Sequence, residues 1–165
     1  PLQQLGVAAC LLSDISWLEH PDYRSEQAYL RTLRMPFGGI DHVGRAFLAL
    51  ALYLRYGGRV DDQTVYAAHV LLDQETLNTA ISLGLMLRLA YTLCGGALAL
   101  LERTRLARER SRLVLEIAPE AADLKVEAVE RRLEALAKSM SLDPELRIAP
   151  KGRKTALERL GSVGR

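Results

Sequence analysis

Apolar residues recur at spacings of three and four through the first half of the chain, which is the pattern of amphipathic helices. One such stretch covers residues 3–16, and another covers residues 21–34 with a proline in its first turn. Residues 35–39 contain a proline and two glycines, so we expect a loop there. Asp41 precedes residues 42–56, which are apolar nearly all round, and this predicts a capped helix at the centre of a bundle.

Two more helices are expected before the pattern changes. Asp61 or Asp62 is placed to cap a short helix that ends near Val70, and a longer apolar helix is expected over residues 76–94. That longer segment has the length of a membrane span, but Arg88 lies within it, and charged residues are rare at the centre of spanning helices. We therefore interpret it as a core helix.

After residue 96 the apolar spacing shortens towards that of strands. We expect strands at 99–106, 113–117 and 143–148, a turn at 107–110, and an amphipathic helix over 123–140. The sequence thus predicts a mainly α protein in which a helical bundle is followed by a small β-β-α-β unit.

The length of the chain and the distribution of its charges indicate how it is divided into domains. We expect a helical bundle over residues 1–95, a small α+β subdomain packed on it over 96–150, and a basic, flexible tail over 151–165. The net charge of the whole chain is only +2, which gives no reason to expect nucleic acid binding. The basic tail is best explained by a solvated chain end, and the alternative is a contact for a polyanion.

The two cysteines, Cys10 and Cys94, lie in apolar stretches and form no CxxC pair. We expect both to be buried free thiols in a reducing compartment, which indicates the cytoplasm. No secretory signal is visible, and since Pro1 is not an initiator residue we expect a fragment of a longer protein.

Three histidines and a few acids are the candidates for acid–base or metal chemistry. Asp14 with His20, and Asp41 with His42, could supply ligands from different helices. Acids and histidines at helix ends more often serve as caps, and His69 lies among apolar neighbours where ordinary packing explains it.

Three segments carry a resemblance to a known family. They are AACLLSDISW at residues 8–17, HPDYR at 20–24 and GIDHVGRAFLALA at 39–51. Together they resemble the HD-like helical domain of the Ppx/GppA phosphatases, the exopolyphosphatases and guanosine pentaphosphate phosphohydrolases. Residues 112–148 are similar to the small α+β end of that domain.

The resemblance implies a degenerate metal site. HD proteins bind metal through a His-Asp pair, and the position that matches the histidine is Ser13 here, while Asp14 keeps the aspartate. A further histidine of the motif would lie upstream of Pro1, and His20 cannot complete the set. We therefore expect no metal, no other cofactor and no catalytic residue in this chain.

The resemblance also implies an enzyme of two parts. An actin-like catalytic domain, expected to bind Mg²⁺, removes the terminal phosphate of inorganic polyphosphate or converts pppGpp to ppGpp. None of its glycine-rich phosphate loops is found in this chain. The expected role here is an accessory one without turnover: to contact the catalytic domain, to help hold polyphosphate or pppGpp, and to form a homodimer, with no membrane or nucleic acid partner.

Basic side chains near the family-like segments are the candidate substrate contacts. Guanidinium groups suit phosphate oxygens, although arginines on helices are more often simply solvated. The candidates are His20, Arg24, Arg31, Arg45 and Arg55, with His20, Arg24 and Arg45 preferred.

Two alternatives remain open from the sequence. One is a free-standing metal-dependent HD phosphohydrolase that uses Asp14, His20 and His42. The other is a purely structural oligomerisation module that binds no polyphosphate.

Overall fold

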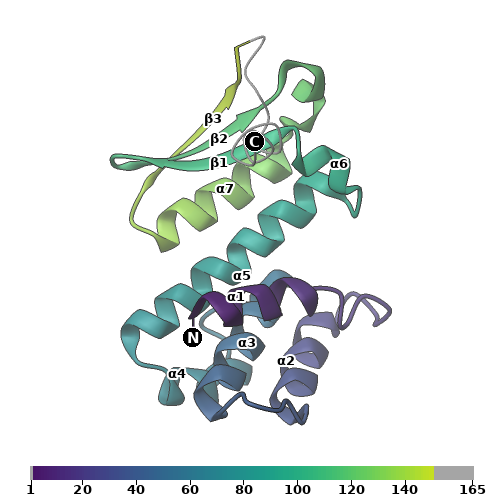
Figure 1. Cartoon of the computed structure of the whole chain (residues 1–165), viewed down its shortest axis with the longest axis vertical. Helices are drawn as coiled ribbons and strands as arrows, with labels where there is room; N and C mark the ends of the chain where they lie inside the picture. Colours follow the sequence, from purple (N-terminus) through teal and green to yellow (C-terminus); the bar gives the residue numbers. More distant parts are fainter. Residues whose placement is uncertain (1, 151–165) are drawn as a thin grey trace, which may run out of the picture. The chain divides into compact units, whose positions relative to one another are not determined.

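The structure is a computed structural model that describes residues 2–150, and it divides between Arg88 and Leu89 into two compact units (Figure 1). The basic tail expected at 151–165 lies outside the described residues. The first unit is helical and the second contains a small sheet, so the predicted mainly α class with a β-β-α-β unit is confirmed.

The helices of the first unit surround α3 (His42–Arg55). They are α1 (Leu2–Leu11), α2 (Arg24–Arg34), the 3-10 turn η1 (Gln63–Val65), α4 (Tyr66–Leu71) and the first part of α5 (Gln74–Cys94). As predicted, Asp41 caps α3: its Oδ1 accepts a hydrogen bond from the Gly44 amide at 2.7 Å. From Ala46 to Arg55 every residue of α3 is buried, which agrees with an apolar sequence on all sides of the helix.

A glycine allows α5 to lie close against α3. A Cβ atom built at Gly84 would be 2.5 Å from the carbonyl oxygen of Ala51 and 2.8 Å from the Leu54 Cβ. Leu77 and Ala80, on the preceding turns of α5, belong to the same buried core. The segment interpreted as a core helix thus packs on the centre of the bundle.

By length and composition α5 could also cross a membrane, and 33% of its most apolar stretch is buried. One such helix is weak evidence for a membrane segment, because core helices of soluble proteins pass the same test.

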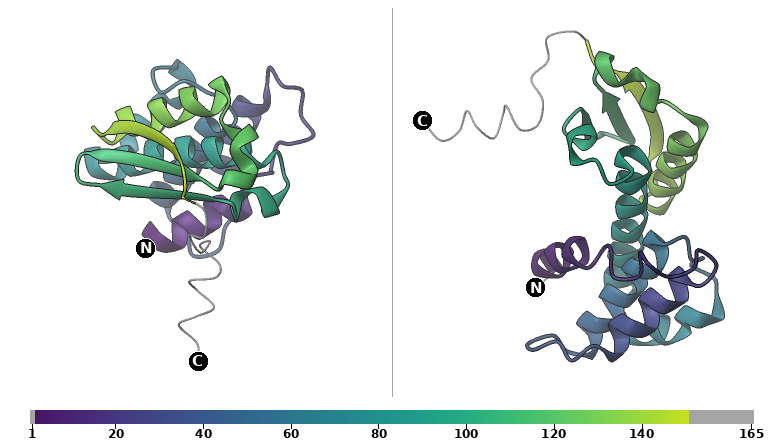
Figure 2. Two further views of the ribbon diagram at one scale, coloured as in Figure 1. Left: turned by 90° about the horizontal axis from the view of Figure 1, so that it is seen from above. Right: turned by 90° about the vertical axis from the view of Figure 1, so that its right-hand side faces the viewer.

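In the second unit a three-stranded sheet is ordered β1-β2-β3. The chain runs through α6 (Leu98–Leu101), β1 (Thr104–Glu109), β2 (Arg112–Ile117), the 3-10 segment η2 (Pro119–Leu124), α7 (Glu127–Ser139) and β3 (Asp143–Ile148). β1 pairs antiparallel and β3 parallel with β2. Both views show α7 lying along one face of this sheet (Figures 1 and 2).

Several sequence predictions need correction. The helix expected at 3–16 ends at Leu11, and residues 12–18 form turns. The strand expected at 99–106 begins instead as α6, because a short apolar run fits a helix turn as well as a strand. The helix expected at 123–140 starts only at Glu127. Cys94 is buried and Cys10 is exposed, although both are free thiols as expected.

Candidate functional site

The Ser13-Asp14 motif lies in the turns that connect α1 to α2. The backbone folds through successive short-range hydrogen bonds, with the amides of Ile15, Trp17 and Glu19 donating to carbonyls three residues earlier at 3.0, 3.0 and 3.1 Å. The motif therefore lies beyond the end of a helix, where its side chains face other elements. We call residues 12–19 the motif loop.

A buried arginine is paired with the aspartate of this motif. Nη2 of Arg55, at the end of α3, lies 3.2 Å from Oδ1 of Asp14. The Arg55 side chain is 4% exposed and that of Asp14 is 74% exposed, so the charge pair joins the core to the surface. The Arg55 guanidinium also lies over the ring of Tyr56, 4.2 Å from its centroid. A side-chain cation thus occupies the position beside the aspartate.

Tyr56 also contacts the motif loop. Its hydroxyl oxygen accepts a hydrogen bond from the Ser16 amide at 3.1 Å. Burial raises the pKa of Tyr56, while the Ser16 amide and then the Arg55 guanidinium oppose that rise, and the Asp14 carboxylate adds to it. The neutral phenol is the form that fits this site at neutral pH.

Two arginines of α2 hold the other side of the motif loop. Arg24 Nε donates to the Glu19 carbonyl at 2.7 Å, and its guanidinium lies 4.8 Å from the centroid of the Trp17 ring. Arg31 donates to the Ile15 carbonyl at 3.2 Å and forms an ion pair with the Glu19 carboxylate. Arg24, Arg31 and Arg55 therefore converge on one loop.

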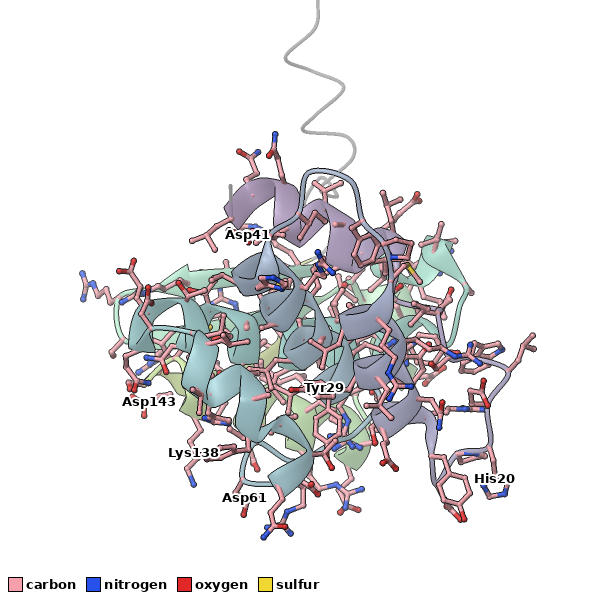
Figure 3. The ribbon with its side chains drawn as sticks, turned by 90° about the horizontal axis from the view of Figure 1, so that it is seen from below. His20, Tyr29, Asp41, Asp61, Lys138 and Asp143 are labelled. Carbon is pink, nitrogen blue, oxygen red and sulfur yellow. The ribbon has the colours of Figure 1, made fainter. Side chains whose placement is uncertain are left out.

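The other predicted contacts lie elsewhere. His20 is exposed, and its Nδ1 accepts the Asp22 amide at 3.4 Å and lies 3.6 Å from an Asp22 carboxylate oxygen. Figure 3 shows His20 at the periphery, away from Tyr29 in the core and from Asp41. Arg45 lies near the start of α3, ten residues before Arg55, which is about 15 Å along a helix.

The structure does not bring the predicted alternative metal ligands together. His42 is at the opposite end of α3 from Arg55, the residue that contacts Asp14, and His20 pairs locally with Asp22. Among residues 2–150 no group of three or more His, Cys, Asp or Glu side chains is arranged to hold a metal ion.

A groove at the C-terminal end of α2 extends the basic surface. It has a volume of about 460 Å³ and is lined by Gln27, Leu30, Arg31, Arg34, Met35 and Pro36. Arg24, Arg31 and Arg34 follow one another at spacings of seven and three, so they share one face of the helix. Arg34 was not among the preferred candidates, although this spacing was visible in the sequence.

The comparison with known families shows which family the chain belongs to. The profile of the exopolyphosphatase C-terminal family matches residues 3–144. The chain belongs to this family. No curated protein matches the chain in a direct sequence comparison.

The match covers both units of this exopolyphosphatase C-terminal domain. It begins in α1, includes the motif loop and all of α7, and ends at the start of β3. The resemblance of residues 8–51 and 112–148 to this family is therefore confirmed, and the match covers the sheet as well as the helices.

Proposed function

We propose that this domain helps to hold a polyanionic substrate for a catalytic domain of the same protein, and that it does not cleave phosphoanhydride bonds itself. The observation that carries the proposal is the row of arginines on α2 beside the open groove. A protein of the exopolyphosphatase family is expected to contain a catalytic partner domain, so the substrate contacts proposed here would serve chemistry done elsewhere.

The row of arginines has dimensions that suit a chain of phosphates. From Arg24 to Arg34 the helix rises about 15 Å, with a guanidinium group near each end and Arg31 between them. Arg24 and Arg31 each use part of their hydrogen-bonding capacity to hold the motif loop. A guanidinium has five N–H donors, so each retains donors for phosphate oxygens. The loop contacts fix these two groups in place before any ligand binds.

The pairing of Asp14 with Arg55 argues against a free-standing metal-dependent hydrolase. A divalent ion at Asp14 would have to approach within a few ångströms of the Arg55 guanidinium, and two cations in one site repel each other. Arg55 itself is buried, so we do not include it among the substrate contacts.

We extend the proposal to the whole protein in the terms that the family suggests. Its substrate would be inorganic polyphosphate or pppGpp, its actin-like catalytic domain would bind Mg²⁺, and it would act in the cytoplasm as a homodimer. These statements rest on family membership and on the free thiols Cys10 and Cys94.

Binding of fluorescently labelled polyphosphate to the 165-residue chain tests the substrate contacts. Replacing Arg31 and Arg34 together by glutamine should weaken binding by about tenfold or more, since each lost charge-assisted contact contributes about 1 kcal/mol or more. Arg108→Gln with Arg131→Gln is the matched control, because both arginines are exposed and lie in the second unit.

Two results would contradict the proposal. Equal loss of binding in the control pair would show that only total charge matters. Release of phosphate from polyphosphate by this chain, abolished by a chelator, would show that the domain is itself a metal-dependent hydrolase.

A further inference from the structure

One face of the sheet in the second unit is covered by charged side chains that contact one another. Arg147 on β3 forms ion pairs with Glu116 on β2 at 2.7 Å and with Glu109 on β1 at 2.8 Å. Arg105 on β1 approaches Glu116 at 3.3 Å. These contacts across three strands require that the side chains project from the same face.

The strand register arranges this face in rows, which run across the sheet from β1 to β3. The first row is Arg105, Glu116 and Arg147, and the last row is Glu109, Arg112 and Asp143. The signs are therefore plus, minus, plus in the first row and minus, plus, minus in the last. Between them lies a row of Ala107, Val114 and Glu145. We call these nine side chains the ionic face.

We propose that the ionic face is a contact surface between two copies of this chain, related by a two-fold axis that crosses the strands along the middle row. Such an axis places the first row of each copy opposite the last row of the other. Arg105 then faces Glu109 of the second copy, Arg112 faces Glu116, and Arg147 faces Asp143. Each of these pairs has opposite charges and occurs twice.

The charge pattern favours this arrangement over the one in which the two-fold axis runs parallel to the strands. A two-fold axis parallel to the strands would place Arg105 opposite Arg147 and Glu109 opposite Asp143, which are like charges. With the axis across the strands, the two sheets pack face to face with their strands aligned, an ordinary geometry for packed sheets. Val114 in the middle row has no exposed surface and Glu116 is only 3% exposed, so the contact with the second copy is made mainly by the two outer strands. Glu145 is held there by Arg112 at 2.9 Å.

The size of the face sets the strength to be expected. Three strands of six residues cover about 300 Å² at the usual strand spacing and rise. A standard interface buries about 800 Å² on each partner. The ionic face alone should therefore give weak association that depends on salt, and it fixes how the two copies are oriented. This inference rests on the self-association proposed above and is independent of polyphosphate binding.

Asp143→Lys tests the face with little disturbance of the fold. Among residues 2–150 Asp143 forms no ion pair of its own, so its reversal mainly changes the contact with Arg147 of the second copy. Sedimentation equilibrium at low salt should show the dissociation constant rising by about tenfold or more, because two attractive pairs become repulsive. Asp123→Lys on η2 changes the net charge equally and should leave association unchanged.

Mixing two variants gives a sharper test. Arg105→Glu and Glu109→Arg should each associate poorly alone, since each places like charges opposite each other. An equal mixture should recover association, because the glutamate introduced at position 105 of one variant then faces the arginine introduced at position 109 of the other. Far-UV circular dichroism checks that each variant is folded. If either is not, the comparison of Asp143→Lys with Asp123→Lys tests the ionic face.

Two outcomes overturn the inference. If the unaltered chain stays monomeric at its highest soluble concentration in low salt, both the ionic face and the proposed self-association fail. If it associates but Asp143→Lys and Asp123→Lys behave alike, another surface joins the copies and only the ionic face fails. Neither outcome bears on polyphosphate binding by the α2 arginines.

Discussion

At the scale of single residues, the feature that most changes the interpretation of the sequence is the contact between Arg55 and Asp14. The motif without its histidine indicated that a metal site was lost. The structure adds that the Arg55 guanidinium lies 3.2 Å from the Asp14 carboxylate. Asp14 is therefore the partner of a buried cation, which is a structural role.

Removing this guanidinium should destabilise the first unit. Arg55→Ala is expected to lower the free energy of unfolding by about 2–4 kcal/mol, because it deletes a fully packed side chain and leaves a cavity. Asp14→Asn should cost about 1 kcal/mol or less, since that side chain is mostly exposed. Urea unfolding of both single variants and of the double variant measures the two effects. Equal costs for the two single variants would contradict this ranking.

The buried phenols predict how stability changes at alkaline pH. Burial raises the pKa of Tyr29, Tyr53 and Tyr56 above the ordinary value of 10.0. In the folded state these phenols keep protons that the unfolded chain releases near pH 10. Their contribution to stability is therefore fully present below pH 10 and is lost as the pH rises through the pKa values of the folded state. Tyr56→Phe should flatten that decline in urea unfolding between pH 8 and 11. An unchanged slope would show that Tyr56 contributes nothing to it.

At the scale of elements, the helices that carry the core were predictable and the loop that carries the motif was not. The apolar sequence of α3 and its Asp41 cap are local features, and both predict the helix that forms. The motif loop is shaped by Arg24, Arg31 and Arg55, which come from two helices. Periodicity cannot show which carbonyls such side chains reach. The sequence therefore did not show the partners of Asp14 and Glu19.

Apolar runs of a few residues were the other source of error. The segment after Gly96 has neither a cap nor enough length to distinguish a helix from a strand, and its first part forms α6. By contrast β3 forms at 143–148 as predicted. Cys10 lies in an apolar helix, but its own side chain faces outward, because one face of an outer helix remains exposed.

Replacing glycine by alanine should have opposite effects on stability at Gly84, where α5 lies close to α3, and at Gly6 in α1. Gly84→Ala should destabilise by about 1–3 kcal/mol, since the added methyl would lie 2.5 Å from the Ala51 carbonyl oxygen. Gly6→Ala in α1 meets no atom within 4 Å and should stabilise by about 0.5–1 kcal/mol, the usual advantage of alanine in a helix. Urea unfolding of both variants checks this, and stabilisation by Gly84→Ala would contradict the packing described.

At the scale of the whole molecule, the chain combines two charged surfaces with different charge patterns. The arginines of α2 share one sign and are proposed to contact a polyanion. The ionic face alternates in sign, which favours a copy of itself over a polyanion. Because the two surfaces belong to different units, substitutions in one can be tested without altering the other.

Salt should weaken polyphosphate binding and self-association while leaving the stability of the fold nearly unchanged. Raising the salt concentration from about 0.05 to about 0.5 M should weaken both polyphosphate binding and self-association, because charges at exposed surfaces are screened. The urea midpoint should change little, since the core of the first unit is apolar. Binding and sedimentation measured across this range test the expectation, and salt-independent association would indicate an apolar interface.

The guanidinium beside Asp14 also bears on how such a domain can evolve. Placing histidine at position 13 would supply the second ligand of the His-Asp pair that the resemblance implies, yet the site would still contain the buried positive charge of Arg55. Binding a metal there would first require the loss of Arg55, and a protein without Arg55 would have a weakened fold and no ion to compensate. With Arg55 in place, selection for stability alone would therefore keep the domain from acquiring metal chemistry at Asp14.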